Sequence, residues 1–228
     1  VIGPSGSGKS SLVRAGILPS LKRGYEKEHW MVLPAVRPST GTTMGLAKAY
    51  AQCFQDFGER RDWLSINEIF MRAIQNPTFS GPLELTEQLR LVAGRPDATL
   101  LITVDQVEEM LGGRISDQPM THLLRTIAQT HGAGLVILGT LRSDFLGELQ
   151  RQWTVESIGY QIFPMSMDEI NIRSIIAEPA RVFDVKIEDN LVHRLVTQAQ
   201  TGASLPLLAF ALRDLWDRCR ERNDREMC

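Results

Sequence analysis

A phosphate-binding sequence stands at the start of the chain. Residues 3–10 read Gly-Pro-Ser-Gly-Ser-Gly-Lys-Ser, which matches the Walker A pattern, or P-loop. Glycines let successive backbone N–H groups turn towards phosphate oxygens, and the helix that follows adds its positive N-terminal end. We expect Lys9 to contact the β- and γ-phosphates and the Ser10 hydroxyl to bind Mg²⁺. The predicted nucleotide contacts are Gly3, Pro4, Ser5, Gly6, Ser7, Gly8, Lys9, Ser10 and Ser11.

A Gly/Ser-rich loop that matches this pattern by chance is the alternative. The apolar Val1 and Ile2 before the motif and the helical spacing of apolar residues after it argue against chance. A P-loop normally follows a buried strand of about five or six residues. Because only Val1 and Ile2 remain of that strand, we expect the chain to be a fragment of a longer protein.

A group of acids follows a second apolar run. Residues 99–104, Thr-Leu-Leu-Ile-Thr-Val, predict a buried parallel strand of the Walker B type, and Asp105 comes directly after it. Asp105 is expected to hold Mg²⁺, which prefers an octahedral shell of oxygens that includes water. Since the adjacent position is Gln106, Glu108 is our candidate for the acid that activates the attacking water, with Glu109 in reserve. The alternative is that both glutamates only begin the next helix, where acids are favourable.

A polar residue and a cation end the next apolar run. Residues 134–140 predict another strand that finishes at Thr140 and leads into Arg142. An arginine at this place can contact the γ-phosphate and stabilise transition-state charge. The alternative is that Arg142 forms an ion pair with Asp144 or Glu148.

Strand-like and helix-like patterns alternate over the first two thirds of the chain. This alternation predicts an α/β fold, a three-layer αβα domain with a mainly parallel sheet and its ligand at the carboxyl ends of the strands. The predicted strands are 30–36, 99–104, 134–140 and 157–163, and the predicted helices are 9–18, 43–57, 65–75, 82–92 and 117–129.

The pattern changes after Pro164, because no further strand-like run is present. Helices are predicted at 166–178, 189–200 and 204–222, the first from a capping-box pattern at 166–169. We therefore predict two domains, a P-loop NTPase domain over 1–164 and a small, all-helical domain over 165–228.

Composition excludes several classes of protein. The chain has 228 residues, of which 43% are hydrophobic and 23% charged, and a formal net charge of -2. These values are typical of a soluble globular protein, with no basic excess that would indicate nucleic-acid binding. The three cysteines lack the spacing of a zinc site, and no apolar run has the length of a membrane span. We expect a cytoplasmic protein with no membrane partner and no direct nucleic-acid partner.

Several segments together resemble one family. They are Gly-Lys-Ser-Ser-Leu-Val-Arg-Ala-Gly at 8–16, Val-Asp-Gln-Val-Glu-Glu at 104–109, Thr-Leu-Arg-Ser-Asp-Phe-Leu-Gly-Glu-Leu at 140–149, and the segments 163–170, 176–180 and 202–208. In this order they resemble the novel STAND NTPase domain of signal-transduction ATPases, relatives of the AAA+ group. The segment 202–208 contains one residue more than the family's Gly-x-Pro motif.

The resemblance implies a module that binds ATP or ADP with Mg²⁺, hydrolyses ATP slowly and acts as a conformational switch. It implies that Pro206, in a helical lid, contacts the adenine. It also implies self-association, or sensor and effector domains of a longer protein that lie outside this chain. The family further implies roles in signalling, regulated cell death or defence against phage. Two alternatives stay open: a small nucleotide kinase of the guanylate-kinase type, and a scaffold that binds ATP without hydrolysing it.

Overall fold

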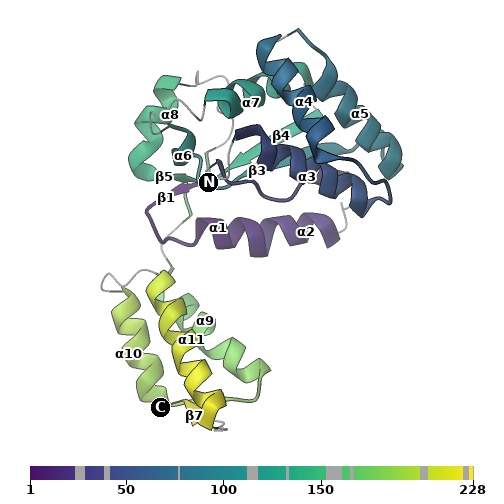
Figure 1. Ribbon diagram of the computed structural model, residues 1–228. Coiled ribbons are helices and arrows are strands. Elements are labelled where there is room, and N and C mark those ends of the chain that lie inside the picture. Colours follow the sequence, from purple (N-terminus) through teal and green to yellow (C-terminus); the bar gives the residue numbers. More distant parts are fainter. Residues whose placement is uncertain are drawn as a thin grey trace. The chain divides into compact units, whose positions relative to one another are not determined.

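The computed structural model describes most of the chain (Figure 1). The described residues are 1–23, 29–38, 42–76, 78–111, 118–131, 134–152, 161–164, 167–200, 205–222 and 226–227. The chain divides into two compact units, the first comprising Val1–Gly3 and Lys9–Ile162 and the second comprising Pro4–Gly8 and Phe163–Cys228. The assignment of separate domains at 1–164 and 165–228 stays a prediction.

Parallel strands form the centre of the first unit. The strands are β1 Ile2–Gly3, β2 Trp30–Val32, β3 Thr99–Val104, β4 Leu135–Gly139 and β5 Leu141–Arg142. β3 pairs with β2 on one side and with β4 on the other, while β1 pairs with β5, and every pair is parallel. The predicted parallel sheet is therefore confirmed.

Backbone hydrogen bonds connect these two sets of strands. The N-terminal amine of Val1 donates to Gly139 O at 2.7 Å, and Leu141 N donates to Val1 O at 2.9 Å. The chain of β4 and β5 therefore lies between β3 and β1. Ile2 N also donates to Ile162 O at 2.8 Å. The strand predicted at 157–163 lies mostly outside the described residues.

Helices cover both faces of the sheet. They are α1 Lys9–Ser11, the π-helix η1 Leu12–Ile17, α2 Leu18–Arg23, α3 Thr42–Asp56, α4 Trp63–Gln75, α5 Gly81–Ala93, α6 Glu108–Leu111, α7 Gln118–His131, the 3₁₀ turn η5 Ser143–Phe145 and α8 Leu146–Gln152. On one face, Leu100 and Ile102 of β3 belong to a large core shared with α3, α4, α5 and α7. On the other face, Leu101 packs in a smaller core with Val13 and Leu18 of the first helical segment. Successive residues of β3 thus serve opposite faces, as expected for a strand covered on both sides.

The first helical segment is longer than the sequence predicts. Its three parts run without interruption from Lys9 to Arg23, beyond the predicted end at residue 18, so Pro19 does not end the segment. Proline lacks an N–H and its ring disturbs the carbonyl four residues earlier in an α-helix. Here the wider π-helix η1 precedes it, and the N–H of Leu18 donates to Val13 O, five residues back. The segment accommodates Pro19 by this local widening.

The start of α4 also differs from its prediction. The helix begins at Trp63, and Asp62 is its N-cap, because the Asp62 carboxylate accepts a hydrogen bond from Leu64 N at 3.2 Å. The helix therefore begins two residues before the start that the sequence predicts at residue 65. A cap depends on extended backbone geometry before the helix, which Asp62 has, with φ -75° and ψ 123°.

Replacing Asp62 with alanine is expected to lower the free energy of unfolding by about 1 kcal/mol, because the first turn of α4 loses its acceptor. Urea denaturation monitored by circular dichroism measures this loss. Asp62→Asn is the matched control, since its amide oxygen can still accept the bond, and we expect it to retain most of the stability. Equal destabilisation by both substitutions would show that the cap does not act through this oxygen.

The described part of the second unit contains three long helices. α9 Glu169–Val182, α10 Asp189–Gln200 and α11 Leu205–Arg222 pack around an apolar core that includes Ile172 and Val196. Asp168 caps α9 by accepting from Asn171 N at 2.7 Å, whereas Ser166 of the predicted capping box lies outside the described residues.

The prediction that this segment is entirely helical is not confirmed. β6 Lys186–Ile187 pairs in parallel with β7 Glu226–Met227. Strands of two residues are too short to produce an alternating pattern that sequence reasoning can detect. Pro179 also lies inside α9 instead of ending it.

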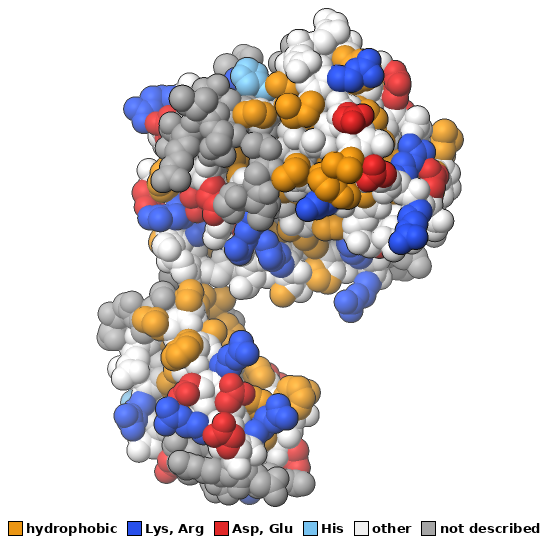
Figure 2. Space-filling view, in the orientation of Figure 1, with side chains coloured by type: hydrophobic (Ala, Val, Ile, Leu, Met, Phe, Trp, Pro, Cys, Tyr) orange, Lys and Arg blue, Asp and Glu red, His pale blue; other side chains and the backbone are white. Residues whose placement is uncertain are grey.

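Exposed apolar side chains are present on the second unit, and Figure 2 shows several on the face in view. They include Ile170, Val182, Phe183, Leu207 and Phe210. Among the described helices of both units, none is both long and apolar enough to span a membrane.

Candidate functional site

The predicted P-loop forms a turn that contains two left-handed glycines. Ser7 N donates to Pro4 O at 3.3 Å, and Gly6 and Gly8 have φ angles of 74° and 81°. These left-handed conformations are easily adopted only by glycine. Ser11 is exposed at the end of α1. The local conformation thus agrees with the motif that the sequence predicts.

Lys9 is the buried cation of the site. Its side chain is mostly enclosed, and Nζ donates to the carbonyl oxygen of Gly3 at 2.9 Å. Burial lowers the pKa of Lys9 below its ordinary value, and Arg142 adds to this effect, while Glu108, Asp144 and Asp105 oppose it. The charges that act on Lys9 thus include Asp105, Glu108 and Arg142, which the sequence selects at other strand ends.

Asp105 is the point at which several elements meet. Its side chain is 1% exposed, directly after β3. Oδ1 accepts one hydrogen bond from Ser10 Oγ at 2.6 Å and another from Thr140 Oγ1 at 2.7 Å. The predicted metal-binding pair, Ser10 and Asp105, is thus in direct contact, and Thr140 fixes the carboxylate from the neighbouring strand end.

Two arginines approach the other oxygen of the same carboxylate. Arg14 Nη2 lies 3.0 Å from Asp105 Oδ2, and Arg37 Nε lies 3.5 Å from it. Burial alone would raise the pKa of Asp105, but the hydrogen bonds from Ser10 and Thr140 and the two guanidinium charges outweigh it, so this pKa is lowered. The carboxylate is held in its charged form.

Sequence reasoning did not select these two arginines as site residues. Two signals were available. Arg14 follows Ser10 by four positions, which places both on one face of a helix. Arg37 follows the apolar run that begins at β2, and the carboxyl ends of parallel strands share one edge of the sheet.

The chain turns sharply between Asp105 and α6. Gln106 has φ 66°, which is uncommon for a residue other than glycine, and its N–H donates to Thr140 Oγ1 at 2.9 Å. Glu108 then begins α6, and its Oε2 accepts from the backbone N–H of Arg142 at 3.2 Å. Glu109 lies in the same first turn. The glutamates do begin a helix, as the alternative interpretation expects, and Glu108 in addition contacts the end of the neighbouring strand.

Arg142 forms the ion pair that was considered as the alternative to a phosphate contact. Its Nη2 pairs with Asp144 Oδ2, and its guanidinium lies 5.4 Å from the centre of the Phe145 ring. Both members of the ion pair are well exposed, so the pair is readily exchanged with water or another anion. The role of Arg142 in contacting the γ-phosphate stays a prediction.

The model of the family described as novel STAND NTPase 1 matches residues 1–227. The chain belongs to this family. The resemblance inferred from the motifs is therefore confirmed, and it extends over both units. A search of the curated proteins finds no match.

Pro206 is the residue that the resemblance to the novel STAND NTPase family implies as the adenine contact. This residue is the second of α11 and is exposed. The residues 201–204 before it lie outside the described part of the chain. The contact between Pro206 and adenine stays a prediction.

The groups around Asp105 fit the magnesium ion that a novel STAND NTPase is expected to bind. Within the described part of the chain, no three His, Cys, Asp or Glu side chains converge on one point. Mg²⁺ does not need such a cage, because it commonly takes one or two protein oxygens together with waters and substrate phosphates. Asp105 Oδ2 is buried and accepts no hydrogen bond of regular geometry from the described residues. The Ser10 hydroxyl oxygen and Asp105 Oδ2 are suitable ligands for the ion, or suitable partners for the waters bound to it.

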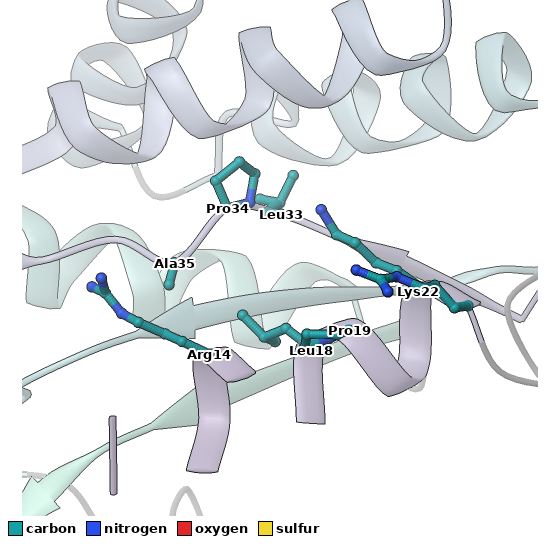
Figure 3. Close-up of a pocket in the computed structure, with 8 residues that line it drawn as sticks. Arg14, Leu18, Pro19, Lys22, Leu33, Pro34 and Ala35 are labelled. Atoms are coloured by element: carbon teal, nitrogen blue, oxygen red, sulfur yellow. The ribbon is translucent and has the colours of Figure 1, made fainter. Parts of the chain in front are cut away.

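A pocket of about 320 Å³ adjoins this part of the novel STAND NTPase fold. Figure 3 shows Arg14 and Lys22 at opposite ends of the pocket, with Leu18 and Pro19 between them. Arg14 thus borders the pocket and also pairs with Asp105. The side chain that reaches the buried carboxylate is accessible from the surface.

Proposed function

We propose that the chain is an ATP-binding, slowly hydrolysing switch module. The observation that carries this proposal is the 2.6 Å hydrogen bond from Ser10 Oγ to Asp105 Oδ1, between residues 95 positions apart. A hydroxyl directly after a P-loop lysine and a carboxylate at the end of a buried strand are the groups that P-loop NTPases use to hold magnesium and triphosphate.

Each residue has a distinct task in this proposal. The P-loop N–H groups and Lys9 bind the phosphates, and Mg²⁺, held by Ser10 and Asp105, would neutralise phosphate charge. Glu108 orients and deprotonates the attacking water, and Arg142 stabilises charge on the terminal phosphate. The hydrogen bond from Arg142 N to Glu108 supports a common location for these last two groups.

The proposed output is a change of conformation. A nucleotide that contacts both the P-loop and Pro206 would shift the equilibrium between conformations by its different affinity for each. ADP would favour a closed form, and ATP an open form able to self-associate. A role in signalling, cell death or defence against phage rests on the family alone.

Two other functions make different predictions. A nucleotide kinase of the guanylate-kinase type would transfer phosphate to a mononucleotide at about 1 to 100 per second. A scaffold would bind ATP without releasing phosphate. Calorimetric titration with ATP, ADP and GTP, together with a phosphate-release assay and a GMP phosphorylation assay, distinguishes these functions. The switch proposal expects tight binding of adenine nucleotides, slow phosphate release and no phosphorylated GMP.

Asp105→Asn is expected to raise the Mg²⁺ concentration needed for half-maximal enhancement of ATP binding by about 10- to 100-fold, because the metal loses a charged neighbour. Titration of Mg²⁺ at fixed ATP in a calorimeter measures this change. Asp97→Asn is the control, since Asp97 is exposed in the loop before β3. An identical Mg²⁺ titration for Asp105→Asn and wild type would exclude this role for Asp105.

A further inference from the structure

Two arginines that no motif assigns share the carboxylate at the centre of the site. Arg14 lies on η1 and Arg37 lies after β2, and their guanidiniums reach Asp105 Oδ2 at 3.0 and 3.5 Å. Ser10, one helical turn before Arg14, is bound to the opposite oxygen. The two guanidiniums are therefore only one carboxylate group away from the hydroxyl that is proposed to bind magnesium.

The direction of these side chains favours contact with the phosphates. Side chains on a helix lean towards its N-terminus, and the N-terminus of α1 is the end that follows the P-loop. Arg37 approaches from the carboxyl edge of the sheet, where α/β proteins bind their ligands. Both arginines therefore converge on the end of the site that would hold the terminal phosphate.

The arginines can change partner more easily than the carboxylate can. The Asp105 side chain is 1% exposed and is fixed by Ser10 and Thr140, whereas Arg14 and Arg37 are 43% and 45% exposed. In addition, Asp105 Oδ2 receives no regular hydrogen bond from the described residues. The half-exposed guanidiniums can therefore reach another anion more readily than the buried, fixed carboxylate can move.

We infer that Arg14 and Arg37 exchange between Asp105 and the terminal phosphate of bound ATP, and so give the site an affinity for ATP that ADP does not receive. This inference rests on the proposed function. A magnesium ion held by Asp105 would supply the carboxylate with a new counter-charge, so that the guanidiniums of Arg14 and Arg37 could leave it. A guanidinium binds phosphate oxygens with two parallel N–H groups, which a Lys ammonium cannot reproduce.

Binding of ATP and of ADP to Arg14→Gln and Arg37→Gln, measured separately by calorimetry, tests the inference. We expect each substitution to weaken ATP binding about tenfold or more, because a charge-assisted bond to the γ-phosphate is lost. ADP binding should change less than about threefold, which is within the usual effect of a distant charge. Arg14→Lys and Arg37→Lys should bind ATP more tightly than the glutamine variants, since lysine keeps the positive charge but lacks the paired N–H groups of the guanidinium. Arg181→Gln is the control, because Arg181 is exposed on α9 and pairs there with Glu178.

An Asp105→Asn background separates a phosphate contact from a purely structural ion pair. Asparagine removes the buried charge, so Arg14→Gln in this background does not leave a carboxylate without its counter-charge and should fold. If Arg14 contacts phosphate, the added substitution still weakens ATP more than ADP. If the effect disappears in this background, Arg14 acts only through Asp105 and the inference is overturned.

Equal losses of ATP and ADP affinity, or no loss, would also overturn it. These outcomes differ from failure of the proposed function, in which the wild-type chain binds neither nucleotide. Circular dichroism melting of every variant provides the check on folding.

Discussion

Replacing Lys9 with alanine is expected to weaken ATP binding at least about a hundredfold, since charge-assisted bonds to two phosphate groups are lost together. Lys9 is buried, and its Nζ donates to Gly3 O at 2.9 Å. Because Gly3 ends β1 and is the first residue of the predicted P-loop, Nζ lies beside the start of that sequence. Calorimetric titration with ATP and Mg²⁺ measures the loss.

Lys9→Met separates the charge of Lys9 from its packing. Methionine fills a similar volume, and it removes an ammonium whose pKa is lowered chiefly by burial. Because a buried charge is costly, the midpoint of thermal unfolding should not fall in this variant, although ATP binding is lost.

Lys22→Ala is the control for a general loss of positive charge, since Lys22 is exposed on α2 at the far end of the same helical segment. It should bind ATP as wild type does. An unchanged ATP isotherm for Lys9→Ala would contradict the assignment of the whole loop.

Local patterns predicted the long elements well. The helix predicted at 189–200 is α10, and the strand predicted at 99–104 is β3, with the same bounds. In both cases the apolar pattern within the segment indicates which faces are buried: one face of α10 and both faces of β3. No distant part of the chain is needed to recognise them.

Features that depend on distant contacts were not predictable in the same way. The place of β1 beside β5 depends on hydrogen bonds between strands of two residues each. The helical segment through Pro19 depends on packing of Val13 and Leu18 against the sheet, which outweighs the tendency of proline to end a helix.

The candidate site also contains some residues that local motifs predict and others that depend on distant contacts. The motifs selected Lys9, Ser10 and Asp105 because their residue types and spacing are specific to phosphate and magnesium chemistry. The motifs could not show that Arg14 and Arg37 share Asp105, since an ion pair depends on the order of strands and the direction of side chains. Arginines are common on protein surfaces, so the spacing of Arg14 from Ser10 and the position of Arg37 after β2 are weak signals until the tertiary structure is known.

Glu108→Gln is expected to reduce phosphate release by about 10²- to 10⁴-fold, the usual contribution of a general base. The substitution suits this test because the amide oxygen of glutamine can still accept the hydrogen bond that Arg142 N makes with Glu108 Oε2 at 3.2 Å. The contact between α6 and β5 is thereby kept, and ATP binding should stay close to wild type.

Two further variants identify how Glu108 acts. Glu109→Gln alters the neighbouring acid in the first turn of α6 and should leave phosphate release nearly unchanged if Glu108 is the base. Glu108→Ala removes both the base and the acceptor, so it should lose hydrolysis and also some stability. If Glu108→Gln releases phosphate at the wild-type rate while Glu109→Gln does not, the base is Glu109, and Glu108 serves only to connect α6 with the strand that leads to Arg142. If both variants release phosphate normally, neither acid activates the water, and slow hydrolysis by these residues is excluded.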